Sequence, residues 1–367
     1  MVRDSSPMAE VKYNDHHGEP KLKMRLKSLS MPCHSSSEVK IVVAPLLSHS
    51  FVLSLSHSQL DFCKINIIPL LILSGISLSS TGSTMMGREI LQRMKVKAGF
   101  VNTPDTGKGK GKILKHITHG YHLVKGKTNH AMEDYVVSDF KQVQGKELGL
   151  FAIFDGHSGH DVANYLQTHL FSKILDQPDF WTETEDAIRK AYRDTDNEIL
   201  EKAMVLGKGG STAVTAILLN GEKLVVANVG DSRAVISRNG VAKQLSVDHE
   251  PSKEKRLIES RGGFVSNLPG DVPRVDGQLA VARAFGDKTL KIHLSSEPDV
   301  KVEIIENDVE FMILASDGIW KVITNEEAVN LIRNIKDAHT AAKTLIDHAL
   351  SLKSKDDISC IVVRFQH

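Results

Sequence analysis

The chain is poor in cysteine, in net charge and in long apolar runs, and each shortage argues against a class of protein. Its three cysteines, Cys33, Cys63 and Cys360, have neither paired nor metal-type spacing, which argues against a disulfide framework and for a reducing compartment. None of them begins a Cys-x5-Arg loop, so a phosphatase with a cysteine nucleophile is disfavoured. The 46 basic residues are balanced by 45 acidic ones, which gives no electrostatic reason to expect nucleic-acid binding.

Membrane insertion is also disfavoured. The apolar run at residues 65–78 is shorter than the roughly 20 residues that span a bilayer, and Pro69 interrupts it, so we expect no stable membrane span. Residues 21–60 contain one acid, Glu38, among many serines and basic residues. This composition leaves open an organelle transit peptide.

The composition changes near residue 112. We expect residues 1–112 to be a poorly ordered extension that ends in a solvated Gly/Lys-rich linker at 104–112. The extension could also be dispensable, with translation starting at Met85 or Met86. Residues 113–367 are then one folded domain, which we expect to reside in the cytosol, the nucleus or both.

Strand and helix signals are dense from residue 113 onward. Consecutive strands joined by short turns, such as Asn239-Gly240, favour antiparallel sheets with helices packed outside, which is an α+β architecture. The expected strands are 136–140, 147–154, 211–219, 223–229, 233–238 and 241–245. The expected helices are 160–176, one capped by Thr182 and Glu185, one near 252–261, one capped by Thr324 and Glu327, and 341–352.

Acidic residues stand where the expected strands stop, or in the turns just beyond them. A carboxylate at a strand end points out of the core from a rigid base, and several that converge provide the hard oxygen ligands of Mg²⁺ or Mn²⁺. One such Asp-Gly is an ordinary turn signal, but the conjunction predicts a divalent-metal centre. The five landmarks are Glu133-Asp134, Asp155, Asp231, Asp317 and Asp356-Asp357.

Seven short motifs contain these landmarks in order. They are Ala131-Met132-Glu133-Asp134, Phe154-Asp155-Gly156-His157-Ser158-Gly159, Gly210-Ser211-Thr212-Ala213, Val229-Gly230-Asp231-Ser232-Arg233, Leu279-Ala280-Val281-Ala282-Arg283-Ala284-Phe285-Gly286-Asp287, Asp317-Gly318-Ile319-Trp320 and Lys355-Asp356-Asp357-Ile358-Ser359. Their order and content resemble the protein phosphatase 2C family, the metal-dependent Ser/Thr phosphatases. Residues 124–135 are similar to plant members.

The resemblance implies a central sandwich of two antiparallel β-sheets flanked by α-helices, in four αββα layers. It also implies hydrolysis of phosphoserine and phosphothreonine on proteins by a water that bridges two Mn²⁺ or Mg²⁺ ions. His157 would protonate the leaving alkoxide, while His160 is expected to be structural. The implied metal-binding positions are Glu133, Asp134, Asp155, Gly156, Asp231, Asp317 and Asp356, with Asp155 bridging both ions and Glu133 and Asp134 acting mostly through water.

Two positions depart from the family pattern. Asn129 stands where many members place an arginine that grips the substrate phosphate, and Lys127 or His130 are the candidates to replace it. Lys321 stands where members often have an acid that helps Asp231 to hold a weaker third ion. Two alternatives therefore stay open, a catalytically weak pseudophosphatase acting as a binding module and a metal-dependent hydrolase of small phosphate esters.

The expected partners are phosphorylated protein substrates, and we expect a monomer. Plant members that serve as abscisic-acid co-receptors use a tryptophan in the flap that precedes the Leu279 motif. The only tryptophans are Trp181 and Trp320, and neither lies in the flap expected at residues 262–278. We therefore predict that the protein is not a co-receptor for that hormone.

Overall fold

The computed structural model describes residues 43–46, 50–53, 106–114 and 116–366. The chain divides into two units, residues 1–101 and residues 102–367. The described part of the first unit is an antiparallel hairpin of β1 (Val43–Leu46) and β2 (Ser50–Leu53). The second unit contains all other described elements. None of the helices in the described ranges is both long enough and apolar enough to cross a membrane.

The expected linker contains a strand. Residues Thr106–Lys110 form β3, which pairs antiparallel with β4 (Ile117–Val124). These residues are therefore a paired strand and not an irregular linker, although their side chains stay exposed or half-buried, because pairing at a sheet edge depends on the neighbouring strand and not on local composition. The expectations for residues 1–42 and 54–105, including the apolar run and two of the cysteines, lie outside the described residues.

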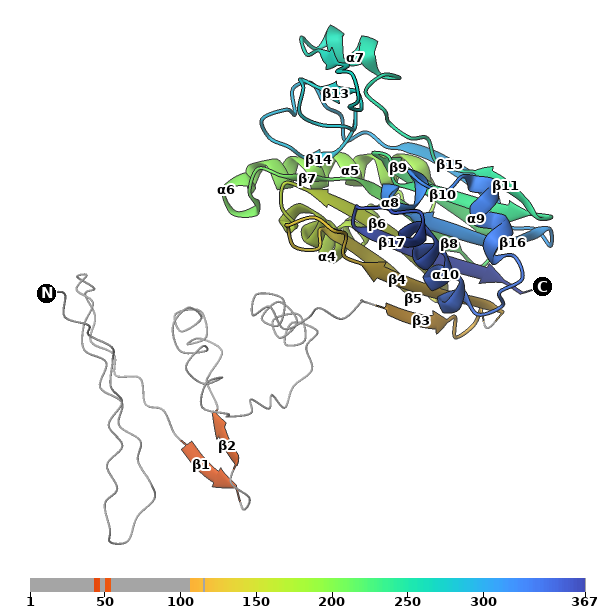
Figure 1. The fold of residues 1–367 in the computed structure, drawn as a ribbon. Helices are drawn as coiled ribbons and strands as arrows, with labels where there is room; N and C mark the ends of the chain where they lie inside the picture. The colour runs from red at the N-terminus through yellow and green to blue at the C-terminus, as the bar shows by residue number, and fades with distance from the viewer. Residues whose placement is uncertain (1–42, 47–49, 54–105, 115, 367) are drawn as a thin grey trace, which may run out of the picture. The chain divides into compact units, whose positions relative to one another are not determined.

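One sheet of the second unit has six strands, in the order β11-β10-β16-β17-β4-β3 (Figure 1). All neighbouring strands in it are antiparallel. The Asn239-Gly240 turn joins β10 to β11, as the sequence predicts. The further strands of this sheet are β10 (Arg233–Arg238), β11 (Val241–Gln244), β16 (Val309–Ala315) and β17 (Ile358–Phe365).

The other sheet has seven strands, in the order β14-β7-β6-β8-β9-β15, with β5 also paired to β6. Its pairings are antiparallel too. The strands are β5 (Asp134–Val143), β6 (Lys146–His157), β7 (Gly210–Ser211), β8 (Ala213–Leu219), β9 (Lys223–Val229), β14 (Phe285–Gly286) and β15 (Asp299–Ile304).

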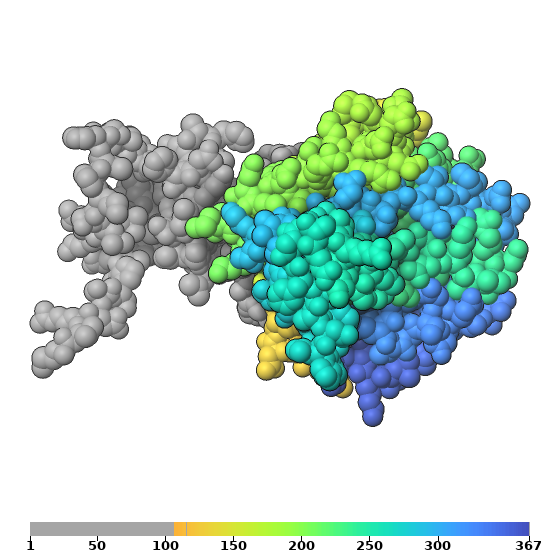
Figure 2. Space-filling model, turned by 90° about the horizontal axis from the view of Figure 1, so that it is seen from above, coloured from red at the N-terminus to blue at the C-terminus, as the bar shows by residue number. Residues whose placement is uncertain are grey.

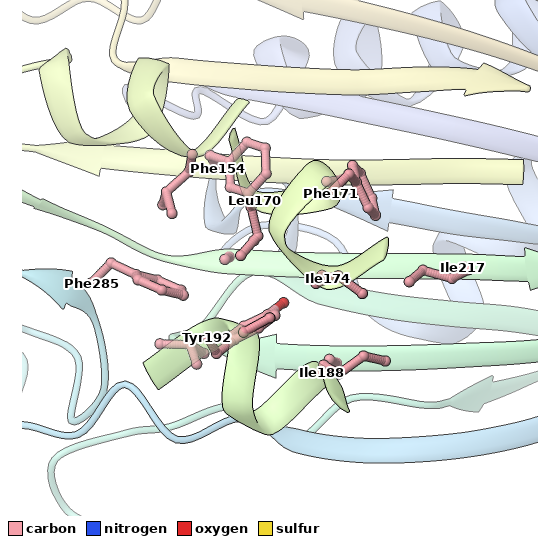
Figure 3. Close-up of a cluster of buried hydrophobic side chains, with 14 of the residues drawn as sticks. Phe154, Leu170, Phe171, Ile174, Ile188, Tyr192, Ile217 and Phe285 are labelled. Carbon is pink, nitrogen blue, oxygen red and sulfur yellow. The ribbon is translucent and has the colours of Figure 1, made fainter. Parts of the chain in front are cut away.

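Helices cover the outer face of each sheet. The helices α4 (Asp161–Leu175) and α5 (Thr184–Glu201) pack on the seven-stranded sheet, and Figure 3 shows side chains of that layer. The helices α8 (Asp317–Trp320), α9 (Asn325–Ile332) and α10 (Ala338–Ser351) pack on the six-stranded sheet. The short helix α6 (Ala203–Leu206) follows α5. The predicted α+β fold with antiparallel sheets and outer helices is confirmed.

Strand β6 explains why the sandwich has a buried centre. Its residues Leu148, Leu150, Ala152 and Phe154 face the α4–α5 layer, whereas Phe151 and Ile153 face the six-stranded sheet. Because successive side chains of a strand point to opposite faces, a strand covered on both faces is apolar throughout. This strand is therefore a rigid base for the polar residues at its end. Cys360 of β17 is buried in the other helix-covered layer, as expected for a small core residue.

The two expected capping boxes had different outcomes. At Thr324 the box is confirmed, because its side chain accepts from the Glu327 amide and the Glu327 carboxylate accepts from the Thr324 amide. At Thr182 the prediction is wrong. Helix α5 begins only at Thr184, and the Thr182 hydroxyl instead donates to the Asp179 carbonyl at 3.2 Å.

The segment expected as a flap forms a small body of its own. It contains a hairpin of β12 (Val265–Ser266) and β13 (Arg274–Val275), which packs with the preceding helix α7 (Lys255–Ser260) around a separate apolar cluster. It stands out from the sandwich in Figure 1 and faces the viewer in Figure 2. Trp181 and Trp320 both lie outside it.

Candidate active site

The end of β6 carries the first group of predicted site residues. Asp155 pairs with Asp134 across the β5–β6 ladder, and the Gly156 amide donates to the Glu133 carbonyl at 3.2 Å. A Cβ at Gly156 would lie 2.8 Å from that carbonyl oxygen, so this approach requires glycine. On the other side, the Thr212 amide donates to the Asp155 carbonyl at 2.8 Å. The backbone thus holds these acidic residues together at one end of the seven-stranded sheet.

The six-stranded sheet supplies the second group. Asp317 begins α8 directly beyond β16, and Asp356 lies in the loop before β17. These neighbouring strands stay in register to their ends, where the Ser316 amide donates to the Ser359 carbonyl at 3.1 Å. Two acids separated by 39 residues of sequence are therefore brought to the same end of the sandwich.

Asp357 connects the two groups. It is buried, and its carboxylate accepts from the Glu133 amide at 2.8 Å and from the Gly126 amide at 2.7 Å. A carboxylate that accepts two backbone hydrogen bonds is a strong structural tie. Sequence reasoning placed Asp357 among the acidic landmarks but gave it no role of its own.

The carboxylates lie close enough to perturb one another. Burial raises the pKa of Asp155 well above its usual range, and the nearby charges of Asp134, Asp317, Asp231 and Asp356 raise it further. Burial also raises the pKa of Asp134 to about 7, which the nearby hydroxyls only partly offset. Carboxylates that are buried and close to one another resist ionisation. The cluster therefore holds several negative charges readily only when a cation is bound.

The donor atoms fit a divalent cation, although the ligand set is not preformed. Both carboxylate oxygens of Asp134 and Oδ1 of Asp317 are buried and make no hydrogen bond of ordinary geometry, although the Ser316 and Ser359 hydroxyls lie near Asp134. Hard, unpartnered carboxylate oxygens are what Mg²⁺ and Mn²⁺ bind. Among the described residues, however, no three acidic, histidine or cysteine side chains lie in the close arrangement of a complete metal site. Instead, the Lys321 ammonium contacts Asp317 and Asp356.

His157 lies beside the cluster and has a partner that sequence reasoning missed. Its Nε2 is 2.7 Å from Oδ2 of Asp287, which is buried. Asp287 belongs to the motif at residues 279–287, but nothing in that motif indicates a contact with a residue 130 positions away. His160 contacts the Tyr135 hydroxyl at 3.3 Å, consistent with the structural role expected for it.

The remaining predicted positions, Asp231, His130 and Lys127, differ in their burial and in their contacts. Asp231 lies in the turn between β9 and β10. Burial is the largest cause of the rise in its pKa, and the charge of Asp317 is the next largest. His130 is engaged locally, with Nδ1 2.8 Å from the Ala131 carbonyl and 3.4 Å from the Glu133 carboxylate. Lys127 is exposed.

Comparison with known proteins assigns this site to a family. Residues 125–358 match the family model described as Protein phosphatase 2C. The chain belongs to the protein phosphatase 2C family. It is 70% identical over 282 residues to "Probable protein phosphatase 2C 58" of Arabidopsis thaliana, an alignment that covers 77% of this chain and 100% of that protein. It is 64% identical over 288 residues to "Probable protein phosphatase 2C 62" of Oryza sativa subsp. japonica, covering 77% and 99% respectively.

Solved structures agree with the family assignment. The crystal structure of serine-threonine phosphatase 2C from Toxoplasma gondii is similar with a TM-score of 0.63 and 25% identity, covering 72% of this chain and 100% of that one. As a plant-type member of the protein phosphatase 2C family, the protein is a Ser/Thr phosphatase, a hydrolase that acts on phosphoproteins. The matched residues include every predicted metal-binding position, whereas β3 lies before them.

Proposed function

We propose that the protein dephosphorylates phosphoserine and phosphothreonine with two Mn²⁺ or Mg²⁺ ions bound at the carboxylate cluster. The observation that carries this proposal is the convergence of acids from both sheets at one end of the sandwich, where burial and mutual repulsion raise their pKa values. Such a cluster costs stability unless it binds cations, so its presence in a phosphatase of this family is best explained by metal binding.

The proposed ligands come from both strand ends. Asp155 and the Gly156 carbonyl lie at the end of β6, and Asp317 and Asp356 lie at the end of the six-stranded sheet. Two divalent ions held there would supply an acidified water as nucleophile and would neutralise charge on the phosphoryl oxygens. We assign Asp231 and the pair Glu133 and Asp134 a supporting role, acting mostly through water. The Glu133 carboxylate already accepts from the Gly159 amide at 2.7 Å, which fixes its orientation.

His157 is proposed as the acid that protonates the leaving alkoxide. Its contact with Asp287 at Nε2 determines which nitrogen is available. When Nε2–H donates to that carboxylate, Nδ1 is the nitrogen that holds and delivers the proton. The side chain is 24% exposed, so it is reachable from solvent yet held by a buried partner. Asp287 is then a positioning residue for His157.

Recognition of the substrate phosphate is assigned to Lys127. His130 is the weaker candidate, because its Nδ1 already contacts the Ala131 carbonyl and lies near Glu133. Lys127 is exposed and is held by its backbone amide, which donates to the Lys355 carbonyl at 2.9 Å beside the cluster. A lysine provides a point charge and not the two-pronged fork of an arginine, so we expect weaker phosphate binding than in relatives that carry the arginine.

Further properties stay predictions. The protein is proposed to be a monomer in the cytosol or nucleus, and not a co-receptor for abscisic acid, because Trp181 and Trp320 lie outside the flap. The pseudophosphatase alternative is not favoured by the family relationship, and we retain the small-ester hydrolase only as an outcome to be measured.

The decisive experiment is hydrolysis of a phosphothreonine peptide by the full-length protein with Mn²⁺, with Mg²⁺ and with a chelator. We expect activity with either metal, no activity with the chelator, and loss of activity in Asp155→Asn. The matched control is Asp347→Asn, which removes an exposed carboxylate on α10 that pairs with Lys343, outside the carboxylate cluster. No turnover at saturating Mn²⁺ with intact metal binding would support a pseudophosphatase. Faster hydrolysis of a small phosphate ester than of the peptide would support the other alternative.

A further inference from the structure

Lys321 holds a position inside the carboxylate cluster where a cation is expected. Its Nζ is 2.5 Å from Oδ2 of Asp317 and 2.9 Å from Oδ2 of Asp356. Those two carboxylates come from different elements, the first turn of α8 and the loop before β17. One ammonium group therefore bridges two acids that we propose as metal ligands.

The position of the ammonium group is defined by the fold. Lys321 follows α8 directly, and its amide donates to the Asp317 carbonyl at 2.9 Å, which places the side chain on the same turn as that carboxylate. Burial lowers the pKa of Lys321, but the two carboxylates raise it by more, so the side chain stays charged. Lys321 also partly offsets the burial that raises the pKa of Asp317. The lysine thus neutralises part of the cluster when no other cation is bound.

An ammonium group held by two carboxylates repels a divalent ion that binds the same carboxylates, because both carry positive charge. Asp317 has Oδ2 on Lys321 and Oδ1 buried without a partner, so a divalent ion bound at Oδ1 would lie close to the ammonium group. Lys321 itself is 53% exposed, which leaves its side chain a way out into solvent. A charged group that is held by two acids and open to water is displaceable, at the cost of its two ion pairs.

We propose that Lys321 is a built-in counterion that competes with the divalent cation for Asp317 and Asp356. This inference rests on the proposed metal-dependent function. Lys321 stabilises the metal-free protein and weakens metal binding. The site therefore fills with metal at a higher free metal concentration than it would without the lysine. Its removal should expose both acids to the metal and should leave the metal-free cluster uncompensated.

The test is calorimetric titration of Mn²⁺ into the full-length, chelator-stripped protein, together with thermal unfolding with and without Mn²⁺. Lys321→Met removes the charge and keeps the apolar stem, and Lys321→Gln is a second neutral variant in case the first folds poorly. Lys321→Arg keeps the charge. Lys343→Met is the matched control, because Lys343 forms an exposed ion pair with Asp347 on α10, 2.6 Å long.

We expect both neutral variants to bind Mn²⁺ about tenfold more tightly, the effect of removing one like charge from a partly screened site. Their metal-free Tm should fall, and the rise in Tm on adding Mn²⁺ should exceed that of the wild type. Lys321→Arg and Lys343→Met should resemble the wild type. Unchanged Mn²⁺ affinity in both neutral variants would overturn the inference and leave the proposed function intact. Absence of Mn²⁺ binding in the wild type would contradict the metal centre itself, and the Lys321 inference with it.

Discussion

Replacing Asp134 with asparagine tests the electrostatics of the cluster in the metal-free protein. Asp134 is 2% exposed, and burial raises its pKa to about 7 from the ordinary value of 3.8. Between these two pH values the folded protein keeps a proton that the unfolded chain has released. The free energy of unfolding therefore falls as pH rises through this window, by up to about 1.4 kcal/mol per pH unit from this residue alone.

The largest possible loss over the whole window is about 4 kcal/mol, a large fraction of the stability of an ordinary domain. Asp134→Asn has no proton to release, so the fall in stability between pH 5 and pH 7 should be smaller by up to about 1.4 kcal/mol per pH unit. Some fall should persist, because burial also raises the pKa values of Asp155, Asp231 and Asp317.

The assay is urea unfolding in chelator at pH 5, 6 and 7, with the free energy extrapolated to water at each pH. Asp347→Asn is the matched control and should keep the wild-type pH dependence. Saturating Mn²⁺ should abolish or reverse the fall, because a bound cation favours ionised carboxylates. An equal slope in Asp134→Asn and the wild type would refute the reasoning.

Three further substitutions test particular contacts. Asp287→Asn should slow hydrolysis of a phosphoserine peptide at least about tenfold and should change hydrolysis of p-nitrophenyl phosphate little. The reason is that the serine alkoxide needs the acid His157 to leave, whereas p-nitrophenolate leaves without it. Equal losses of rate on both substrates would contradict the positioning role of Asp287. Gly156→Ala should cost about 1–3 kcal/mol in urea unfolding, since its Cβ would press on the Glu133 carbonyl. Asp357→Ala should cost about 2–3 kcal/mol by the same measurement, because two backbone amides lose their acceptor; a loss under about 0.5 kcal/mol would mean that water replaces it.

Local sequence patterns were enough for much of the fold. The strands expected at 223–229 and 233–238 have those bounds in the structure, because a short apolar run with a clear turn at each end is a local property. The capping box at Thr324 was predictable for the same reason, since its partner lies three residues away. The expected box at Thr182 failed because the chain before α5 turns on Asp179 instead.

What the sequence alone determined is the chemistry available: acidic residues at the ends of buried strands, in an order specific enough to identify the protein phosphatase 2C family. Only the tertiary structure decided which of those groups meet. The contact of His157 with Asp287, the two amides bound by Asp357, the bridge made by Lys321 and the pairing of β3 all join residues that are distant in sequence or on different elements. Hydrogen bonds and charge interactions depend on separations of a few ångströms, and local sequence patterns do not specify distances between the ends of different strands.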